Sequence, residues 1–225
     1  MFDSSVLIIN AKNYMEASGD RGVKLAKSAE KVARDLGINV IIAPPTPIIY
    51  SVSQSVSIPV FAQHVDLSKV GSTTGFIVPE LLKDMRITGS LVNHSEHQLP
   101  IKAVKSTIER LTQIGMHSVV CAADPRRMGI FAKMGPDAVA IEPPELIGSG
   151  IAVSKARPEV ITDSLKIVRK TGSTSKLICG AGIVTGEDVK RALELGAEGV
   201  LVASGIVKAS DPEAKIRELA VQFRL

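Results

Sequence analysis

The chain has 225 residues, of which 45% are hydrophobic, 22% charged and only 3% aromatic, with a formal net charge of +4. This balance is typical of a globular protein and excludes a disordered chain. The charges form no basic stripe with interleaved aromatic residues, which argues against a nucleic-acid partner. No apolar run is long enough to cross a bilayer and no leader pattern precedes the first apolar run, so we expect a cytoplasmic protein without a membrane segment.

One rhythm recurs along the chain: a short apolar run, a polar turn, and a longer segment with helical periodicity. The predicted strands are Val6–Asn10, Asn39–Ala43, Pro59–Ala62, Gly89–Asn93, Ser118–Cys121, Ala138–Glu142, Lys176–Gly180 and Gly199–Ala203. The predicted helices include Gly22–Leu36, Pro100–Ile114, Pro125–Met134, Pro158–Arg169, Glu187–Leu195 and Asp211–Phe223. Proline at first turns and glycine at helix ends support these helices.

The alternation of strands and helices predicts parallel strands joined by right-handed crossovers. Eight units at a spacing of roughly 25–30 residues favour a closed (β/α)8 barrel, a TIM barrel, over an open doubly wound sheet. No shift of composition marks a boundary, so residues 1–225 are expected to form a single domain. Residues 63–76 break the rhythm, and such a long loop is either functional or a plain insertion.

The two cysteines, Cys121 and Cys179, have no metal-ligand spacing, and each follows a short apolar run. We expect both to be buried thiols at strand ends, which suits a reducing compartment.

In this fold the active site lies at the carboxyl ends of the strands, so polar residues after each apolar run are candidates. Asn10 and Lys12 follow the first run and lie on the same side of an extended chain. A lysine aimed into the barrel mouth would hold an anion, although lysine is also a common surface residue.

The fourth run is followed by Asn93-His94-Ser95-Glu96-His97. A histidine between a strand and a helix can lie near helix N–H groups, which would lower the pKa of His94 and keep its ring neutral. Glu96 could orient neighbouring groups. The alternative is a surface cluster of polar loop residues.

The sixth run is followed by Glu142 and then by two prolines and a glycine-rich stretch. Burial at the barrel rim could raise the pKa of this acid into the range of a working base. The stretch behind it is typical of a lid with a stiff entrance. An exposed acidic turn is the alternative.

The seventh and eighth runs are followed by small residues, Gly182 in one turn and Ala203 and Ser204 in the other. Small side chains let backbone N–H groups approach a ligand closely, and barrels often bind phosphate with these two loops. The pair therefore favours a phosphate ligand without specifying a reaction, and a purely structural glycine turn remains the alternative.

Taken in order, Asn10-x-Lys12, Asn93-His94-Ser95-Glu96, the Glu142-Pro-Pro-Glu-Leu-Ile-Gly segment and the two small-residue turns resemble the triosephosphate isomerase family, and in particular its short archaeal form. The resemblance covers nearly the whole chain. It implies that Glu142 is the catalytic base, His94 the electrophile and Lys12 the cation beside the developing charge, with Glu96 as a supporting acid. The substrate-binding residues it implies are Asn10, Lys12, Ile147, Gly148, Gly182, Ala203 and Ser204.

The resemblance also implies an aldose–ketose isomerase of glycolysis and gluconeogenesis that acts on a triose phosphate with no metal or organic cofactor. Residues 63–76 resemble an interdigitating dimer loop, with Thr74 reaching a neighbouring subunit, and the archaeal likeness favours a homotetramer over a dimer. The sequence departs from the family at His97, where an arginine is usual. Two alternatives are another phosphate-binding barrel enzyme, such as a sugar-phosphate epimerase or an aldolase, and a non-catalytic barrel that binds a phosphate ligand.

Overall fold

A computed structural model describes residues 2, 4–146, 150 and 152–224. Its eight strands pair in parallel in the order β2-β1-β8-β7-β6-β5-β4-β3. A single parallel bridge between Ile42 and Val60 joins the two edge strands, so the sheet closes into the predicted (β/α)8 barrel. The strands are β1 Val6–Asn10, β2 Asn39–Ala43, β3 Phe61–Ala62, β4 Gly89–Val92, β5 His117–Ala122, β6 Ala138–Ile141, β7 Lys176–Cys179 and β8 Gly199–Val202.

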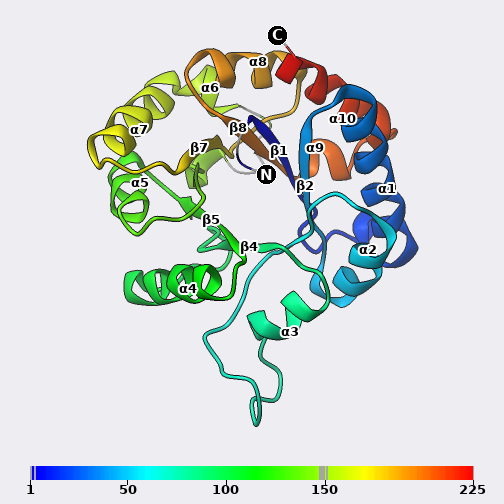
Figure 1. The fold of residues 1–225 in the computed structure, drawn as a ribbon. Coiled ribbons are helices and arrows are strands. Elements are labelled where there is room, and N and C mark those ends of the chain that lie inside the picture. Colours follow the sequence, from blue (N-terminus) through cyan, green and yellow to red (C-terminus); the bar gives the residue numbers. More distant parts are fainter. Residues whose placement is uncertain (1, 3, 147–149, 151, 225) are drawn as a thin grey trace.

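Helices surround the barrel and return the chain from each strand to the next (Figure 1). The longest are amphipathic, and their apolar faces are buried against the strands. The helices are α1 Gly19–Leu36, α2 Ile49–Ser55, α3 Pro79–Asp84, α4 Ile101–Gln113, α5 Pro125–Ala132, α6 Val153–Ala156, α7 Pro158–Lys170, α8 Gly186–Glu194, α9 Ser204–Val207 and α10 Pro212–Ala220. Short 3-10 turns cover Met15–Ala17, Thr46–Ile48, Pro144–Leu146 and Val221–Arg224.

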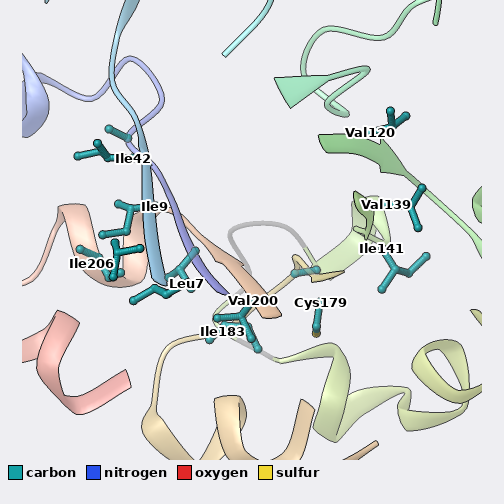
Figure 2. Packing of buried hydrophobic residues seen from close by; sticks show 14 of the residues in the cluster. Leu7, Ile9, Ile42, Val120, Val139, Ile141, Cys179, Ile183, Val200 and Ile206 are labelled. Atoms are coloured by element: carbon teal, nitrogen blue, oxygen red, sulfur yellow. The ribbon is translucent and has the colours of Figure 1, made fainter. Parts of the chain in front are cut away.

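Side chains alternate along each strand between two apolar layers. In β1, Ile8 belongs to the cluster that fills the barrel interior, whereas Leu7 and Ile9 belong to the larger cluster between strands and helices. Figure 2 shows residues of this outer layer, where Ile9 lies near Ile206 of α9. Because this alternation continues past the strand ends, it decides which of the following residues face the barrel mouth.

The structure differs from the sequence prediction mainly at element boundaries. The predicted third strand, Pro59–Ala62, shortens to Phe61–Ala62 because Pro59 has no N–H for the ladder and Val60 makes only the closing bridge. The predicted strands ending at Asn93 and Glu142 stop one residue earlier. Four short helices, α2, α3, α6 and α9, have too few residues to show a clear helical period in the sequence.

The long segment after β3 has no regular structure until α3 begins at Pro79. In Figure 1 this loop extends away from the barrel beyond α3. It is held at its base by Asp66, whose carboxylate accepts the Ile77 N–H at 2.7 Å and whose own N–H donates to the Ile77 carbonyl at 2.8 Å. The two ends of the loop are thus fixed together, and its tip, with Thr74 exposed in a turn, faces solvent.

Candidate active site

The alternation of strand side chains directs the predicted polar residues into one mouth of the barrel. In β1, Ile8 faces the interior, so Asn10 is the next residue on the inner side. In β6, Ala140 faces the interior, which places Glu142 inside. Asn10 and Glu142 are both buried although they are polar.

Lys12 is held in a backbone conformation that is unusual for a lysine. Its φ is +45°, in the left-handed region where side chains other than those of glycine and asparagine are strained. The Lys12 N–H donates to Asn10 Oδ1 at 3.0 Å, and the Lys12 carbonyl accepts the Gln63 amide at 2.9 Å. The ammonium makes a 2.6 Å ion pair with Glu96, so the predicted cation and the supporting acid lie together.

His94 is turned into the mouth by the residue before it. Asn93 has a φ of +61°, which breaks the strand alternation, and asparagine tolerates this conformation. Its side chain is locked on both sides, donating to the Cys121 carbonyl at 2.9 Å and accepting the Leu99 N–H at 2.8 Å. The Glu96 N–H donates to His94 Nδ1 at 3.2 Å, so a neutral ring carries its proton on Nε2.

Glu142 faces this Nε2 across the mouth. The side chain is only 3% exposed, and its Oε1 lies 3.6 Å from His94 Nε2. Both His94 Nε2 and Glu142 Oε2 are buried without a hydrogen-bond partner among the described residues. Gly180 makes room for the acid, since a Cβ on Gly180 would lie 2.5 Å from Glu142 Cγ. Buried polar atoms left unpaired in this way are expensive unless a ligand completes them.

The prediction that the pKa of His94 is lowered is wrong for this arrangement. Burial of the ring lowers the pKa of His94, but the nearby negative carboxylate of Glu142 outweighs burial, and the net pKa is raised. The expected backbone N–H does reach the ring, from Glu96, and it opposes protonation of Nδ1. The carboxylate that decides the direction belongs to Glu142, which faces the other ring nitrogen and is distant in the sequence.

The turns after β7 and β8 complete a pocket of about 490 Å³ around these groups. Gly182, with a φ of +71°, lies in the first turn, and Ala203 and Ser204 lie in the second. The lining residues are Lys12, Tyr14, His94, Glu142, Gly150, Gly180, Gly182, Ile183, Val184, Leu201, Val202, Ala203, Ser204 and Gly205. An ammonium and several backbone segments without bulky side chains make this wall suitable for an anion. Two further predicted phosphate contacts, Ile147 and Gly148, lie outside the described residues.

A second hollow, of about 740 Å³, adjoins the first on the side of Glu96. Asn10 lines this hollow and not the anion pocket. Within the chain its side-chain oxygen accepts the Lys12 N–H and so helps to fix the Lys12 backbone. The rings of His64 and His97 stack here with centroids 3.9 Å apart. Thr74, on the tip of the long loop, lines neither hollow.

Several residues of the site were not among those predicted from the sequence, and three of them hold or flank the catalytic candidates. Gln63 directly follows β3 and would have been found by applying the strand-end rule to that run. Gly180 lay within the inspected turn but was not singled out. Tyr14 lines the pocket and has Lys208 4.5 Å above its ring, and no sequence signal pointed to it.

The described residues contain no cluster of three or more His, Cys, Asp or Glu side chains arranged to hold a metal ion. None of their helices combines the length and the apolar character needed to cross a membrane.

Comparison with known proteins gives a family. The family model described as triosephosphate isomerase matches residues 5–220. Proteins named triosephosphate isomerase are similar over nearly full length: one from Cenarchaeum symbiosum is 49% identical, with 98% of each chain covered, and one from Methanocaldococcus jannaschii is 45% identical, with 95% of this chain and 98% of the relative covered. One from Sulfurisphaera tokodaii is also 45% identical, over 96% of this chain and 94% of the relative. This chain belongs to the triosephosphate isomerase family.

Proposed function

We propose that this chain interconverts dihydroxyacetone phosphate and D-glyceraldehyde 3-phosphate by moving a proton between neighbouring carbons. The observation that carries the proposal is one pocket in which Lys12, His94 and Glu142 meet the small-residue turns after β7 and β8. The names of the archaeal relatives support the same reaction. The turns would bind the phosphate, which leaves the three-carbon chain between the carboxylate and the imidazole.

The reaction follows from the chemistry of these side chains. The Glu142 carboxylate takes a proton from the carbon beside the carbonyl, the C–H electron pair forms a carbon–carbon double bond, and the carbonyl oxygen becomes an oxyanion. His94 donates its Nε2–H to that oxygen, and the Lys12 ammonium stabilises the same negative charge. Return of the proton from Glu142 to the adjacent carbon, with a proton moved between the two oxygens through His94, completes the other isomer. These steps call for no metal or organic cofactor.

The pKa of His94 changes in a useful direction during this cycle. The carboxylate of Glu142 is the main group that raises the pKa of the ring, against the effect of burial. When Glu142 accepts the substrate proton it becomes neutral, so burial then favours an uncharged imidazole. A neutral ring is a weak acid whose pKa is closer to that of an enediol, which suits sharing a proton with it.

The position of Lys176 argues against a Schiff-base mechanism of the aldolase type. Lys176 is the lysine found within the described strands, but it begins β7 at the opposite end of the barrel from Glu142. Its ammonium makes a 2.6 Å ion pair with Glu198.

A coupled assay tests the proposed reaction. Purified protein is given D-glyceraldehyde 3-phosphate in the presence of a chelator, and formation of dihydroxyacetone phosphate is followed by its enzymatic reduction. We expect rapid conversion by the wild type and strong loss in Glu142→Gln, prepared in parallel so that a contaminating isomerase would be detected. Absence of conversion by a folded wild-type protein would leave the fold and remove the function.

The loop of residues 63–76 supports a homo-oligomer, and we propose at least a dimer, with a tetramer favoured by the archaeal likeness. Val70 and Phe76 are 59% and 54% exposed beside Thr74, which is an unusual display of apolar area for a monomer. Thr74 of one subunit would reach the hollow beside Lys12 of another. Sedimentation from nanomolar to micromolar concentration, with activity measured alongside, tests this, and a fully active monomer would contradict it.

We also propose a cytoplasmic location, in a reducing compartment. Cys121 and Cys179 are free and fully buried. Burial raises the pKa of the Cys179 thiol to about 12, so it has almost no thiolate at neutral pH. Buried, free thiols form no structural disulfide, so the fold is stabilised by its apolar core and needs no oxidising compartment.

A further inference from the structure

Asp188, in the first turn of α8, is one of two acidic residues buried in the described part of the chain, and the other is Glu142. The Asp188 side chain is 4% exposed. Its Oδ2 accepts two backbone N–H groups, from Val184 at 3.1 Å and from Thr185 at 2.8 Å. The carboxylate therefore fixes the last residues of the turn that leads from β7 into α8.

The other oxygen of Asp188 faces α6. Lys155 Nζ lies 2.6 Å from Asp188 Oδ1. Burial raises the pKa of Asp188, but the Lys155 ammonium and the hydrogen bonds from the Thr185 and Val184 N–H groups outweigh it, and the net pKa is lowered. The group is thus a charged carboxylate with a donor on each side, held between two elements.

Three consecutive residues of α6 contact this same stretch of chain. The Val153 N–H donates to the Ala181 carbonyl at 3.1 Å. The Ser154 hydroxyl, which is buried, donates to the Asp188 carbonyl at 3.2 Å, and Lys155 adds its ion pair. α6 and the turn after β7 are therefore joined at both ends of the turn.

The turn that is held in this way is one wall of the anion pocket. Gly182, Ile183 and Val184 line it together with Lys12, His94 and Glu142. Gly182 has no side chain to pack and a positive φ, so its own sequence does little to fix its position. The bonds at Ala181 and Val184 restrain the residues on either side of the backbone groups that face the ligand.

We propose that Asp188 is a positioning residue, which fixes the anion-binding turn 182–184 against α6 through Val184 and Lys155. The inference rests on the proposed function, because it assigns this turn to the substrate phosphate. A charged carboxylate is needed because three donors meet its two oxygens. Asparagine has one oxygen, and its NH2 would face either a backbone N–H or the Lys155 ammonium.

The experiment compares two substrates in Asp188→Asn. D-glyceraldehyde 3-phosphate uses the turn, whereas D-glyceraldehyde, which lacks the phosphate, does not. We expect kcat/KM for the phosphorylated substrate to fall about 10- to 100-fold, since a displacement near 1 Å can have this effect. We expect kcat/KM for glyceraldehyde, followed by NMR, to stay within about twofold. The inhibition constant of inorganic phosphate should rise about 10-fold or more, in line with the weaker anion site.

A purely structural role for Asp188 gives a different pattern. Loss of folded protein lowers both kcat/KM values equally and leaves the phosphate inhibition constant unchanged, and that result would overturn the proposal. An unchanged Asp188→Asn enzyme would overturn it too.

A second variant covers the case in which Asp188→Asn does not fold. Lys155→Met removes the ammonium from an exposed position and leaves both backbone hydrogen bonds of Asp188 intact. It should show the same selective loss, smaller in size, whereas the control Lys166→Met, on the exposed side of α7, should show none. Equal kinetics in the two lysine variants would refute a role for the ion pair.

A failure of the proposed function is distinguishable from a failure of this inference. If the wild type converts neither substrate, the isomerase proposal fails. Binding of inorganic phosphate by calorimetry still tests whether Asp188→Asn weakens the anion site.

Discussion

Each end of the barrel holds a histidine beside a carboxylate, and the two pairs are built differently. At the mouth, His94 Nε2 and Glu142 Oε1 are 3.6 Å apart, and each side chain has a buried atom without a partner. At the base, His117 Nδ1 and Asp137 Oδ1 are 2.6 Å apart, and the other oxygen of Asp137 accepts the Ser118 N–H at 2.9 Å. The His117–Asp137 pair finds its hydrogen-bond partners within the chain, whereas the His94–Glu142 pair does not.

This difference separates a stabilising contact from a functional one. The His117–Asp137 pair links the start of β5 to the residue before β6, and no step of the proposed reaction involves it. The His94–Glu142 pair lies in one pocket with Lys12, whose strained backbone the fold must hold in place. Proteins give up stability at functional sites in this way, so changes at the two ends should separate activity from stability.

The largest effect is expected for Glu142→Gln. Without the base, kcat should fall by about 10²–10⁴-fold, the range that general acid–base catalysis contributes. The free energy of unfolding should stay equal or rise by about 1 kcal/mol, because a buried carboxylate with one unpartnered oxygen becomes a neutral amide of the same shape. Steady-state kinetics and urea unfolding measure the two quantities. Glu142→Asp, which keeps the charge but retracts it, should lose on the order of 10²-fold, and near-normal turnover there would refute the assignment of the base.

Gly180→Ala should have the next largest effect. The new Cβ would lie 2.5 Å from Glu142 Cγ, so the carboxylate must move. A shift of this size at the reacting group can lower kcat on the order of 10²-fold. The matched control is Gly172→Ala, at a helix end with open space around its Cβ position but a positive φ, which should affect stability alone. If Gly180→Ala retains normal kcat, the position of Glu142 is less critical than proposed.

A change at the His117–Asp137 pair should do the reverse of a change at the mouth: it should lower stability and leave activity unchanged. Asp137→Asn removes the charge that holds His117 and should lower the free energy of unfolding by about 1 kcal/mol, a value kept small because both side chains are about one-third exposed. kcat/KM at 25 °C should not change. Urea unfolding and the coupled assay decide, and Asp163→Asn in an exposed pair of α7 is the control, with little change expected. A loss of activity without a loss of stability would invalidate the comparison.

Much of the mouth could be predicted from the sequence, because strand alternation and loop position are local rules. Asn10 and Glu142 needed only the boundaries of their strands and a side-chain period of two. Lys12 was singled out by the same period, but its positive φ, held by bonds to Asn10 and Gln63, could not be predicted from it. His94 needed more, since the positive φ of Asn93 that turns it inward comes from hydrogen bonds to Cys121 and Leu99.

What could not be predicted depends on contacts between segments far apart in the chain. The raised pKa of His94 comes from Glu142, 48 positions later, and the pairing of Asp188 with Lys155 joins two separate elements. The His117–Asp137 pair also joins distant segments, because nothing near His117 in the sequence indicates Asp137 as its partner.

The smallest predicted effect is the pH dependence of the contribution that the His117–Asp137 pair makes to the free energy of unfolding. The hydrogen bond to Asp137 raises the pKa of His117, so its contribution to stability is complete below the ordinary histidine value of about 6.5 and is lost as pH rises through the raised value. Burial raises the pKa of Asp137, but the hydrogen bonds from His117 and Ser118 outweigh it, and the net pKa is lowered. Its contribution is therefore present above the ordinary aspartate value of about 4 and is lost as pH falls through the lowered value.

The two directions define a window between about pH 4 and pH 6.5 in which the pair stabilises most. The difference in unfolding free energy between the wild type and Asp137→Asn should be largest near pH 5.5 and should decrease toward pH 9. Measuring this difference, and not the wild type alone, removes the contribution of His94, whose pKa is also raised. A difference that grows from pH 6 to pH 9 would mean that His117 is uncharged in the folded protein and that Asp137 acts through Ser118.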